Sequence, residues 1–484
     1  MALTNVLRSR PRTSTSAVAT IVVTSVAAFM VALDNLVVTT ALPSIREHLH
    51  AGLEGLEWTV NAYTLTFAVL LLPAAALGDR LGRRRVFLAG LTLFTLASAA
   101  AALSTNAEML IIARALQGIG GAAVMPLSLT LLSASVPAHR RGAALGVWGA
   151  ASGLAVALGP VVGGAVTQGA SWEFIFWLNV PIGLLLIPAA RRVLSEAAGP
   201  TKHLDLPGLL LISGGLFGIV FGIVRGNGQG WTSTQVLTAL GAGAALVAAF
   251  LVREKYAASP MLPLRLFRSR AFTAVNIAAL LMSFGMFGSV FLLSQFLQTA
   301  MGYSPLAAGL RTLPWTAMPV LVAPIAGPLS DRIGGKPLLA AGLALQTAGL
   351  GWIAILTSTS VTYPSLIPAF VLSGIGMGLF FVPVATVVFG SVSVDEQGVA
   401  SGANNSFREL GGTMGVAVLG SVFSAAGSFG SKAAFVDGLR PALLVGTIVL
   451  GFGAVAATLI PGRRPTTLVS EQESVEVQPE LVRV

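Results

Sequence analysis

The chain has 484 residues, of which 55% are hydrophobic and 10% are charged, and its formal net charge is +10. Soluble globular proteins carry about 25% charged residues, so this composition predicts a chain whose main solvent is lipid. The absence of cysteine excludes disulfides, thiol catalysis and zinc-thiolate or iron–sulfur sites. The four histidines fall between apolar runs, which excludes a histidine relay or a haem ligand inside a membrane.

Fourteen apolar runs follow one another along the chain, each close to the ~20 residues that a helix needs to cross a membrane. They lie at 17–42, 58–77, 86–104, 107–131, 143–166, 174–190, 205–224, 233–252, 272–299, 312–329, 337–357, 364–389, 398–425 and 441–460. The first run is too long for the core of a cleavable signal peptide and contains Asp34. We therefore predict an all-α integral membrane protein with 14 transmembrane helices.

The basic residues indicate how these helices are oriented. If the N-terminus is cytoplasmic, 22 of the 29 Lys and Arg fall in cytoplasmic segments and 5 in outer segments. Cytoplasmic loops carry an excess of Lys and Arg, and a missed or extra helix would invert the alternation downstream. Both termini are therefore expected in the cytoplasm, and the positive charge requires no nucleic-acid partner.

A repeated loop divides the chain into two similar halves. Residues 77–84 (LGDRLGRR) follow the second helix, and residues 329–336 (LSDRIGGK) follow the tenth helix on the same side. Parallel repeats related by an axis along the membrane normal are one known transporter design. The expected arrangement is 6+2+6: a cytoplasmic N-terminus at 1–16, a six-helix bundle at 17–191, two additional helices at 204–253, a cytoplasmic linker at 254–271, a second six-helix bundle at 272–461 and a cytoplasmic tail at 462–484.

Charges inside the predicted helices are the main functional signal, because a charge in the membrane is costly unless it is paired or hydrated. Of the 19 acidic residues, only Asp34 and Glu409 lie well inside the predicted runs. Asp34 in the first helix and Arg114 in the fourth lie about 12 Å and about 10 Å from the outer ends, at ~1.5 Å per residue. We predict that they face a shared cavity and that Asp34 exchanges a proton. The alternative is a static buried ion pair that locks the two helices together.

Arg408 and Glu409 lie near the middle of the thirteenth helix. Adjacent residues point in different directions from a helix and do not pair with each other. One of them is expected to face a central cavity while the other finds a polar neighbour such as Asn404 or Asn405. This group is a candidate proton or substrate site, and the alternative is that an inner cavity hydrates both charges.

The two repeated loops are candidates for a conformational latch. The residues concerned are Gly78, Asp79, Arg80, Gly82 and Arg83 in the first copy and Asp331, Arg332 and Gly334 in the second. Glycine turns let helix ends approach, and the aspartates can reach arginines or helix N-termini when the cytoplasmic side is closed. The alternative is a charged loop that only stops membrane insertion, although its repetition at matching positions argues against chance.

Small residues gather on the fifth helix, at Gly159, Pro160, Gly163 and Gly164. Small residues let transmembrane helices pack closely, and a proline inside a helix removes a backbone donor and bends it. By themselves these residues indicate only a tight contact between helices.

Several of these segments resemble the motifs of one transporter family. Residues 78–84 resemble the loop signature of the major facilitator superfamily, residues 110–118 its helix 4 motif, and residues 159–164 its antiporter motif of helix 5. Residues 33–43 and 174–183 are similar to segments of its fourteen-spanning drug:proton antiporters, the EmrB/QacA type. The resemblance implies the major facilitator fold, and it implies a role in proton transfer for Arg114.

Together these features predict a proton-coupled antiporter that exports small amphipathic drugs or antibiotics by alternating access. Its expected place is the inner (plasma) membrane of a bacterium. Protons, the bilayer and a small-molecule substrate are its expected partners, a periplasmic adaptor is left open, and the proton gradient drives it without a cofactor or metal. The alternatives are a proton-coupled importer of a small metabolite and a membrane-embedded enzyme or receptor, for which few catalytic groups are available.

Overall fold

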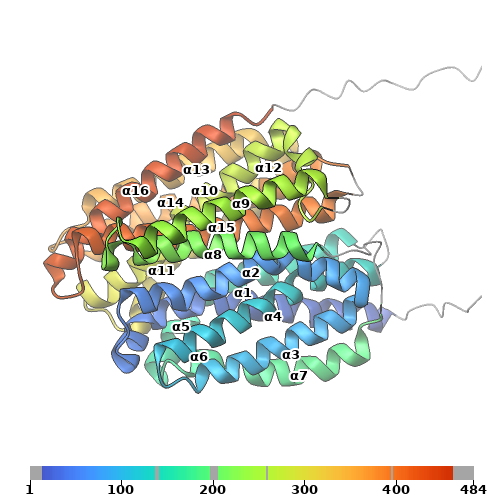
Figure 1. Ribbon diagram of the computed structural model, residues 1–484, viewed down its shortest axis with the longest axis horizontal. Coiled ribbons are helices and arrows are strands. Elements are labelled where there is room, and N and C mark those ends of the chain that lie inside the picture. Colours follow the sequence, from blue (N-terminus) through green and yellow to red (C-terminus); the bar gives the residue numbers. More distant parts are fainter. Residues whose placement is uncertain (1–13, 137–140, 197–204, 258–259, 394–395, 462–484) are drawn as a thin grey trace, which may run out of the picture.

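The chain folds into long helices that run along a common direction (Figure 1). The computed structural model describes residues 14–136, 141–196, 205–257, 260–393 and 396–461. The elements are α1 (Ser14–Leu49), α2 (Leu53–Leu81), α3 (Arg83–Ala102), α4 (Ala107–Ser135), α5 (Arg141–Gly169), α6 (Phe174–Trp177), α7 (Asn179–Val193), α8 (Leu206–Gln229), α9 (Thr234–Tyr256), η2 (Leu264–Arg268), α10 (Arg270–Gln295), η3 (Phe296–Ala300), α11 (Pro305–Thr316), α12 (Met318–Ile333), α13 (Gly335–Leu356), α14 (Tyr363–Gly390), α15 (Gln397–Ala426) and α16 (Lys432–Thr458). Within the described residues, 14 spans are long and apolar enough to cross a membrane, which confirms the predicted number.

Three of these spans consist of two helical pieces each: α6 with α7, α10 with η3, and α11 with α12. The break between α11 and α12 falls at Ala317, two residues before Pro319. The break between α6 and α7 falls at Leu178, three residues before Pro181. Each proline lacks the N–H that would continue the helical hydrogen-bond pattern, which explains why the helix is interrupted near it.

One boundary differs from the sequence prediction in a way that affects the charged residues. The predicted second run begins at 58, whereas α2 begins at Leu53 and therefore contains Glu57. The Glu57 side chain is buried, with 2% of the residue exposed. The sequence prediction counted only acids well inside the runs and therefore did not include Glu57, which is buried in the second turn of α2. Hydropathy alone missed Glu57 because a charged residue interrupts an apolar run. The predicted run therefore starts just after Glu57, about one turn later than the helix does.

Helices α1 to α7 pack against one another as a first bundle, drawn in blue to teal in Figure 1. Its apolar core includes Tyr63, Phe87 and Phe94. Glycines allow α3 and α4 to lie close together, because a Cβ on Gly90 would stand 2.9 Å from the carbonyl oxygen of Gly120.

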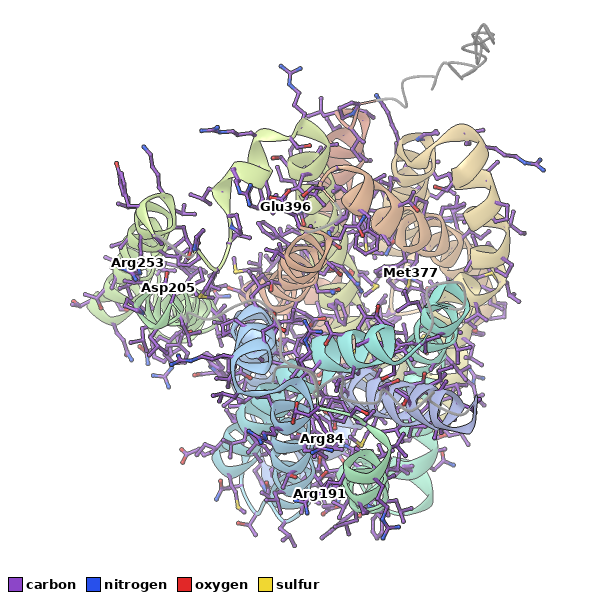
Figure 2. The ribbon with its side chains drawn as sticks, turned by 90° about the vertical axis from the view of Figure 1, so that its right-hand side faces the viewer. Arg84, Arg191, Asp205, Arg253, Met377 and Glu396 are labelled. Atoms are coloured by element: carbon purple, nitrogen blue, oxygen red, sulfur yellow. The ribbon has the colours of Figure 1, made fainter. Side chains whose placement is uncertain are left out.

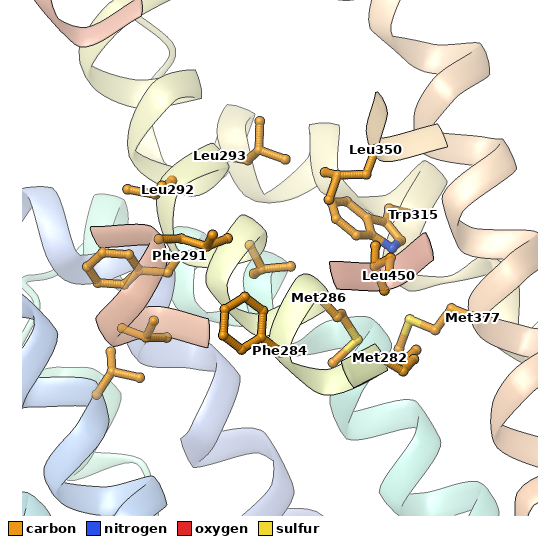
Figure 3. Packing of buried hydrophobic residues seen from close by; sticks show 14 of the residues in the cluster. Met282, Phe284, Met286, Phe291, Leu292, Leu293, Trp315, Leu350, Met377 and Leu450 are labelled. Carbon is orange, nitrogen blue, oxygen red and sulfur yellow. The ribbon is translucent and has the colours of Figure 1, made fainter. Parts of the chain in front are cut away.

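Helices α10 to α16 form a second bundle, in which glycines again let some helices lie close together. Figure 3 shows its buried side chains, including Met282, Phe284, Trp315 and Leu450. A Cβ on Gly288 of α10 would stand 2.6 Å from the backbone of α15, so this glycine sets how closely the two helices pack.

The remaining pair, α8 and α9, packs mainly on itself (Figure 1). Asp205 caps the start of α8 by accepting a hydrogen bond from the Gly208 N–H, at 3.0 Å. The same carboxylate accepts a 2.7 Å bond from Arg253 near the end of α9, which ties the two helices together. Helix α8 also contacts α2 of the first bundle and α15 of the second. It therefore touches both halves of the protein.

The described chain begins and ends on the same side of the molecule, which we call the termini side; the opposite side is the far side. Figure 2 views the termini side, where Arg84, Arg191 and Arg253 carry basic charge at the ends of helices. The alternation of spans puts the ends of α1, α5 and α15 and the starts of α2 and α11 on the far side.

The two bundles meet in a seam that is closed on the far side. A Cβ on Gly164 of α5 would overlap the backbone of Pro305 in α11, and one on Gly309 of α11 would overlap that of Pro160. The Leu306 N–H donates to Gln168 Oε1 across the same contact, at 3.2 Å. By contrast, side-chain positions at Gly146, Gly149 and Gly153 in the termini half of α5 would meet no atom within 4 Å.

This geometry predicts the result of a cross-linking experiment. The chain has no cysteine, so thiols can be introduced one pair at a time. The pair Gln168→Cys and Leu306→Cys should cross-link efficiently with a short thiol reagent in membranes, because the two residues touch in this state. The control pair Gly149→Cys and Leu306→Cys should not cross-link. Equal yields for both pairs, measured by gel mobility, would contradict the closed far-side contact.

Candidate functional site

The interior of the first bundle holds an ion pair. Asp34 Oδ2 of α1 and Arg114 Nη1 of α4 are in direct contact, and both side chains are fully buried. The two helices run in opposite directions, so the residues meet at a similar depth, as the sequence predicts. Each charge stabilises the other at a place where either one alone would be very costly.

Two amides and a hydroxyl complete the surroundings of the Asp34 carboxylate. Asn179 of α7 donates a 2.8 Å hydrogen bond to Asp34 Oδ1, and Gln117 of α4 donates one of 3.2 Å to the same oxygen. Gln117 also accepts from Arg114 Nη1 at 3.0 Å and donates to Ser98 Oγ of α3 at 2.8 Å. The charged pair thus connects four helices of the first bundle, α1, α3, α4 and α7.

Arg114 is held from its other side by a carbonyl and two rings. Its Nε donates to the carbonyl oxygen of Thr59 at 3.2 Å. Its guanidinium carbon lies 4.3 Å from the Tyr63 ring centre and 5.8 Å from that of Phe176. The Tyr63 hydroxyl in turn donates to the Val31 carbonyl at 3.1 Å. These contacts add cation–π stabilisation and fix the guanidinium beside Asp34.

The enclosure corrects one prediction. Asp34 and Arg114 are expected from the sequence to face a shared cavity, but they are 1% and 0% exposed. Side chains of α2, α6 and α7 close around the pair, and helix spacing alone does not reveal them. In this conformation water reaches neither charge, so a proton can exchange at Asp34 only after the surroundings open.

Sequence reasoning missed the polar partners of this pair. Gln117 follows Arg114 by three residues and therefore lies on the same helix face, a signal that was available. Asn179 belongs to the segment 174–183, but nothing in its spacing points to Asp34. Ser98 lies in an apolar run with no distinguishing pattern.

The candidate residues of α15 point to different places. Asn404 donates to Asn276 Oδ1 of α10 at 3.1 Å, whereas Arg408 donates to Asn405 Oδ1 at 3.4 Å and lies over the Phe381 ring at 4.5 Å. Of the two polar neighbours expected from the sequence, Asn405 contacts Arg408, whereas Asn404 contacts α10.

Glu409 lies on the stripe of α15 that faces α2. Ser406 donates to the carbonyl oxygen of Ala68 at 3.1 Å, and Thr413 donates to Thr64 Oγ1 at 2.8 Å. Glu409 falls between these two positions at helical spacing and lies within electrostatic reach of Tyr63. It is half-buried, and no ion pair joins it to Arg408 within the described residues.

The first copy of the repeated loop makes its described contacts within the first bundle. Asp79 and Arg83 form a 2.7 Å ion pair across the turn between α2 and α3. Gly82 in that turn has φ +107°, a conformation that favours glycine, and the Arg84 N–H donates to Glu196 Oε1 at 3.0 Å. The loop is therefore fixed to the segment that follows α7.

The second copy has the same backbone form. Gly334 caps α12 with φ +85°, and its N–H donates to the Ser330 carbonyl at 2.9 Å. Arg332 lies in the last turn of α12. The predicted contact of Asp331 lies outside the described side chains.

The small residues of α5 face two different neighbours. Cβ atoms on Gly159 and Gly163 would overlap Leu36 and Thr40 of α1, within the first bundle. Gly164 and Pro160 instead touch α11 of the second bundle. The tight helix contact predicted from the sequence is thus present on both sides of α5.

Comparison with known proteins identifies the family. A sequence profile of the Major Facilitator Superfamily matches residues 24–416. The chain belongs to this superfamily. It is a transporter family and not a family of enzymes. The transporter also superposes on a bacterial homologue of the human lysosomal transporter Spinster in an inward-facing, unoccupied conformation, with a TM-score of 0.64, 16% identity, and coverage of 93% of this chain and 98% of that chain. At this identity the match shows the fold alone.

Relatives of the transporter are resistance and export proteins. It is 36% identical over 417 residues to the tetracenomycin C resistance and export protein of Streptomyces glaucescens, covering 86% of this chain and 76% of the relative. It is 35% identical over 408 residues to the multidrug resistance protein Stp of Mycobacterium tuberculosis, covering 84% and 76%. It is 34% identical over 424 residues to the methylenomycin A resistance protein of Bacillus subtilis, covering 87% and 91%. The transporter is of the fourteen-spanning EmrB/QacA type.

The buried pair makes a stability prediction. Asp34→Asn should lower the free energy of unfolding by about 3–5 kcal/mol, because it leaves the Arg114 charge buried without a counter-charge. The double variant Asp34→Asn with Arg114→Met should recover most of this loss, since it removes both charges. Thermal unfolding in detergent measures both effects. A double variant that is less stable than Asp34→Asn alone would contradict the pairing.

Proposed function

We propose that this transporter exports small amphipathic drugs or antibiotics in exchange for protons. The observation that carries the proposal is the enclosed Asp34–Arg114 pair, a titratable acid inside the first bundle of a chain whose relatives are resistance proteins. An acid in the membrane interior is retained at a high energetic cost, which favours a functional role over a purely structural one.

The distribution of basic residues supports a cytoplasmic termini side. Arg83, Arg84, Arg191 and Arg192 lie at helix ends there, whereas the far side has fewer basic residues. With this orientation, in a bacterial plasma membrane, the far side is external. We infer from the closed far-side seam, and from the open side-chain positions at Gly146, Gly149 and Gly153, that the structure represents the inward-facing state of the alternating-access cycle.

Proton exchange at Asp34 follows from the geometry of its site. Arg114, Gln117 and Asn179 each donate an N–H group to the Asp34 carboxylate, which favours its charged form. Arg114 also donates to Gln117, so these two donors hold each other in place. Protonation removes the charge that Arg114 neutralises and weakens the link between α1 and α4. We infer that uptake and release of this proton change the packing of the first bundle, which is how a proton gradient drives rocking of the bundles at 17–191 and 272–461.

The substrate is proposed to bind between the bundles, near the middle of α15. Arg408, Glu409 and the Phe381 ring offer charge and an aromatic face there, and both charged residues are half-buried. Few buried acids are present, so a polyvalent cation would lack counter-charges. Uncharged amphipathic molecules and monovalent lipophilic cations fit this site best.

Proton coupling can be tested in proteoliposomes that carry a pH-sensitive dye. Asp34→Asn should abolish substrate-induced proton release, because the side chain can no longer exchange a proton. The matched control is Asp205→Asn, which changes an acid that caps α8 and should leave proton release intact. Normal coupled transport by Asp34→Asn would overturn the assignment, and proton movement with the substrate in everted vesicles would favour the importer.

A further inference from the structure

Glu57 is an acid that the mechanism above does not use. It lies near the far end of α2, is 2% exposed, and faces α15. A Cβ on Gly420 of α15 would overlap its carboxylate, so the Glu57 side chain lies directly on the α15 backbone. Since α2 belongs to the first bundle and α15 to the second, Glu57 is enclosed by the closing of the seam between them.

No cation balances Glu57 in this enclosure. In the far halves of α2 and of the helices packed against it, α3 and α15 carry no charged residue. The titratable His48 of α1 is exposed. The charged groups there are Glu54 of α2, Asp34, Arg46 and Glu47 of α1, Glu108 and Arg114 of α4, and Arg225 of α8.

Each of the three cations is already engaged elsewhere. Arg114 binds Asp34, Arg225 binds Glu54 at 2.8 Å, and Arg46 lies over the Phe429 ring at 4.0 Å. Within the described part of the chain, the Glu57 carboxylate has neither a hydrogen bond nor an ion pair. A carboxylate in this position would be an uncompensated buried charge, whereas the neutral acid would not.

A second polar group on the same face of α2 is also left without partners. Asn61, one turn after Glu57, is fully buried, and neither its Oδ1 nor its Nδ2 has a hydrogen bond. The next turn is different, because Thr64 is bonded to Thr413 of α15. The polar side chains of α2 at the seam therefore have hydrogen-bond partners at mid-depth, whereas Glu57 and Asn61 in its far half have none among the described residues.

Helix α8 covers the far half of the α2–α15 seam, where Glu57 and Asn61 lie. Its Arg225 binds Glu54 of α2, while its Asn227 donates to Ser424 Oγ of α15 at 2.9 Å and to the Ser421 carbonyl. Apolar side chains of α8, including Val220 and Val224, pack against α2 and α15 on the mid-membrane side of these bonds. The additional helix thus clasps both bundles and limits the access of water to Glu57, which is 2% exposed.

We propose that Glu57 is a second proton-binding residue, which must take up a proton from the far side before the α2–α15 seam closes. The proton adds to the carboxylate to give the neutral acid, and it returns to the far-side solution when the seam reopens. Glu57 is therefore a pH-sensitive gate and not part of the exchanged stoichiometry. The proposal rests on the proposed function only in calling the far side external.

The sign of the pH effect follows from linkage. The closed seam binds one more proton than the open seam, so acid on the far side favours closure, by up to about tenfold per pH unit. Helix α8 strengthens this dependence because it limits the water that could hydrate the charged form. For a proton-driven exporter, an acidic exterior thus promotes the return to the inward-facing state.

Distance measurements between two spin labels test the gate. Gly52→Cys before α2 and Ala426→Cys at the end of α15 are exposed far-side positions in a chain without other cysteines. In lipid nanodiscs, double electron–electron resonance should show the short-distance population rising as pH falls. Glu57→Gln should hold the short distance at every pH, and Glu57→Asp should restore the pH dependence. The matched control Glu108→Gln, which changes an exposed far-side acid of α4, should titrate like the parent protein.

Several results would overturn the proposal. The first is a label-to-label distance in the parent protein that does not depend on pH. The second is a Glu57→Gln variant whose distance changes with pH as in the parent, and the third is a Glu57→Gln variant that keeps the long distance of the open seam. If Glu57→Gln fails to fold, Glu57→Ala replaces it. It also removes the titratable group and should abolish the pH dependence of the distance, so parent-like titration of this variant would overturn the gate.

Substrate-induced proton release separates this proposal from the function proposed above. Glu57→Gln should still release protons on substrate addition, because Asp34 is unchanged. If the parent protein releases no protons when substrate is added, proton antiport is refuted. The pH-dependent distances would still support the Glu57 gate. Loss of release in Glu57→Gln alone would overturn the gate as described, since Glu57 would then belong to the exchanged stoichiometry.

Discussion

The need to neutralise one buried acid organises the first bundle. Asp34 lies where water does not reach, so its charge depends on Arg114 and on the amides of Gln117 and Asn179. These groups come from α1, α4 and α7, and each would be left unsatisfied if its helix moved alone. The first bundle is therefore expected to move as a unit, and motion between states has to occur at its boundary with the second bundle.

Hydrogen bonds from neutral side chains to backbone carbonyls cross that boundary, and bonds to water can replace them. Ser294 and Gln298 of the α10–η3 span donate to the carbonyls of Thr39 and Thr40, and Thr316 donates to the carbonyl of Ala157. Hydroxyl and amide donors can turn to water when the seam opens, at little net cost. Strong charge pairing thus holds the interior of one bundle, whereas the hydrogen bonds that join the two bundles are neutral.

The sequence predicted the elements that depend on apolar length and on repeated motifs. The fourteen spans and the meeting of Asp34 with Arg114 follow from hydropathy, helix rise and antiparallel direction. Asn179 and Glu57 could not be found in this way. Asn179 reaches Asp34 only through the packing of α7, and the burial of Glu57 depends on α15 and α8, which are far away in the chain. Side-chain enclosure is a property of several helices together, which explains why the predicted cavity at Asp34 is closed.

The two adjacent glycines of α5 have a consequence for genetics. Gly163 packs against α1 within the first bundle, whereas its neighbour Gly164 packs against α11 in the other half. A bulky residue at 163 therefore disturbs folding of one bundle, so the amount of protein in the membrane falls. A bulky residue at 164 leaves both bundles intact and disturbs only their approach, so normal amounts of protein accumulate with altered switching. Neighbouring codons thus separate alleles that affect abundance from alleles that affect the transport cycle.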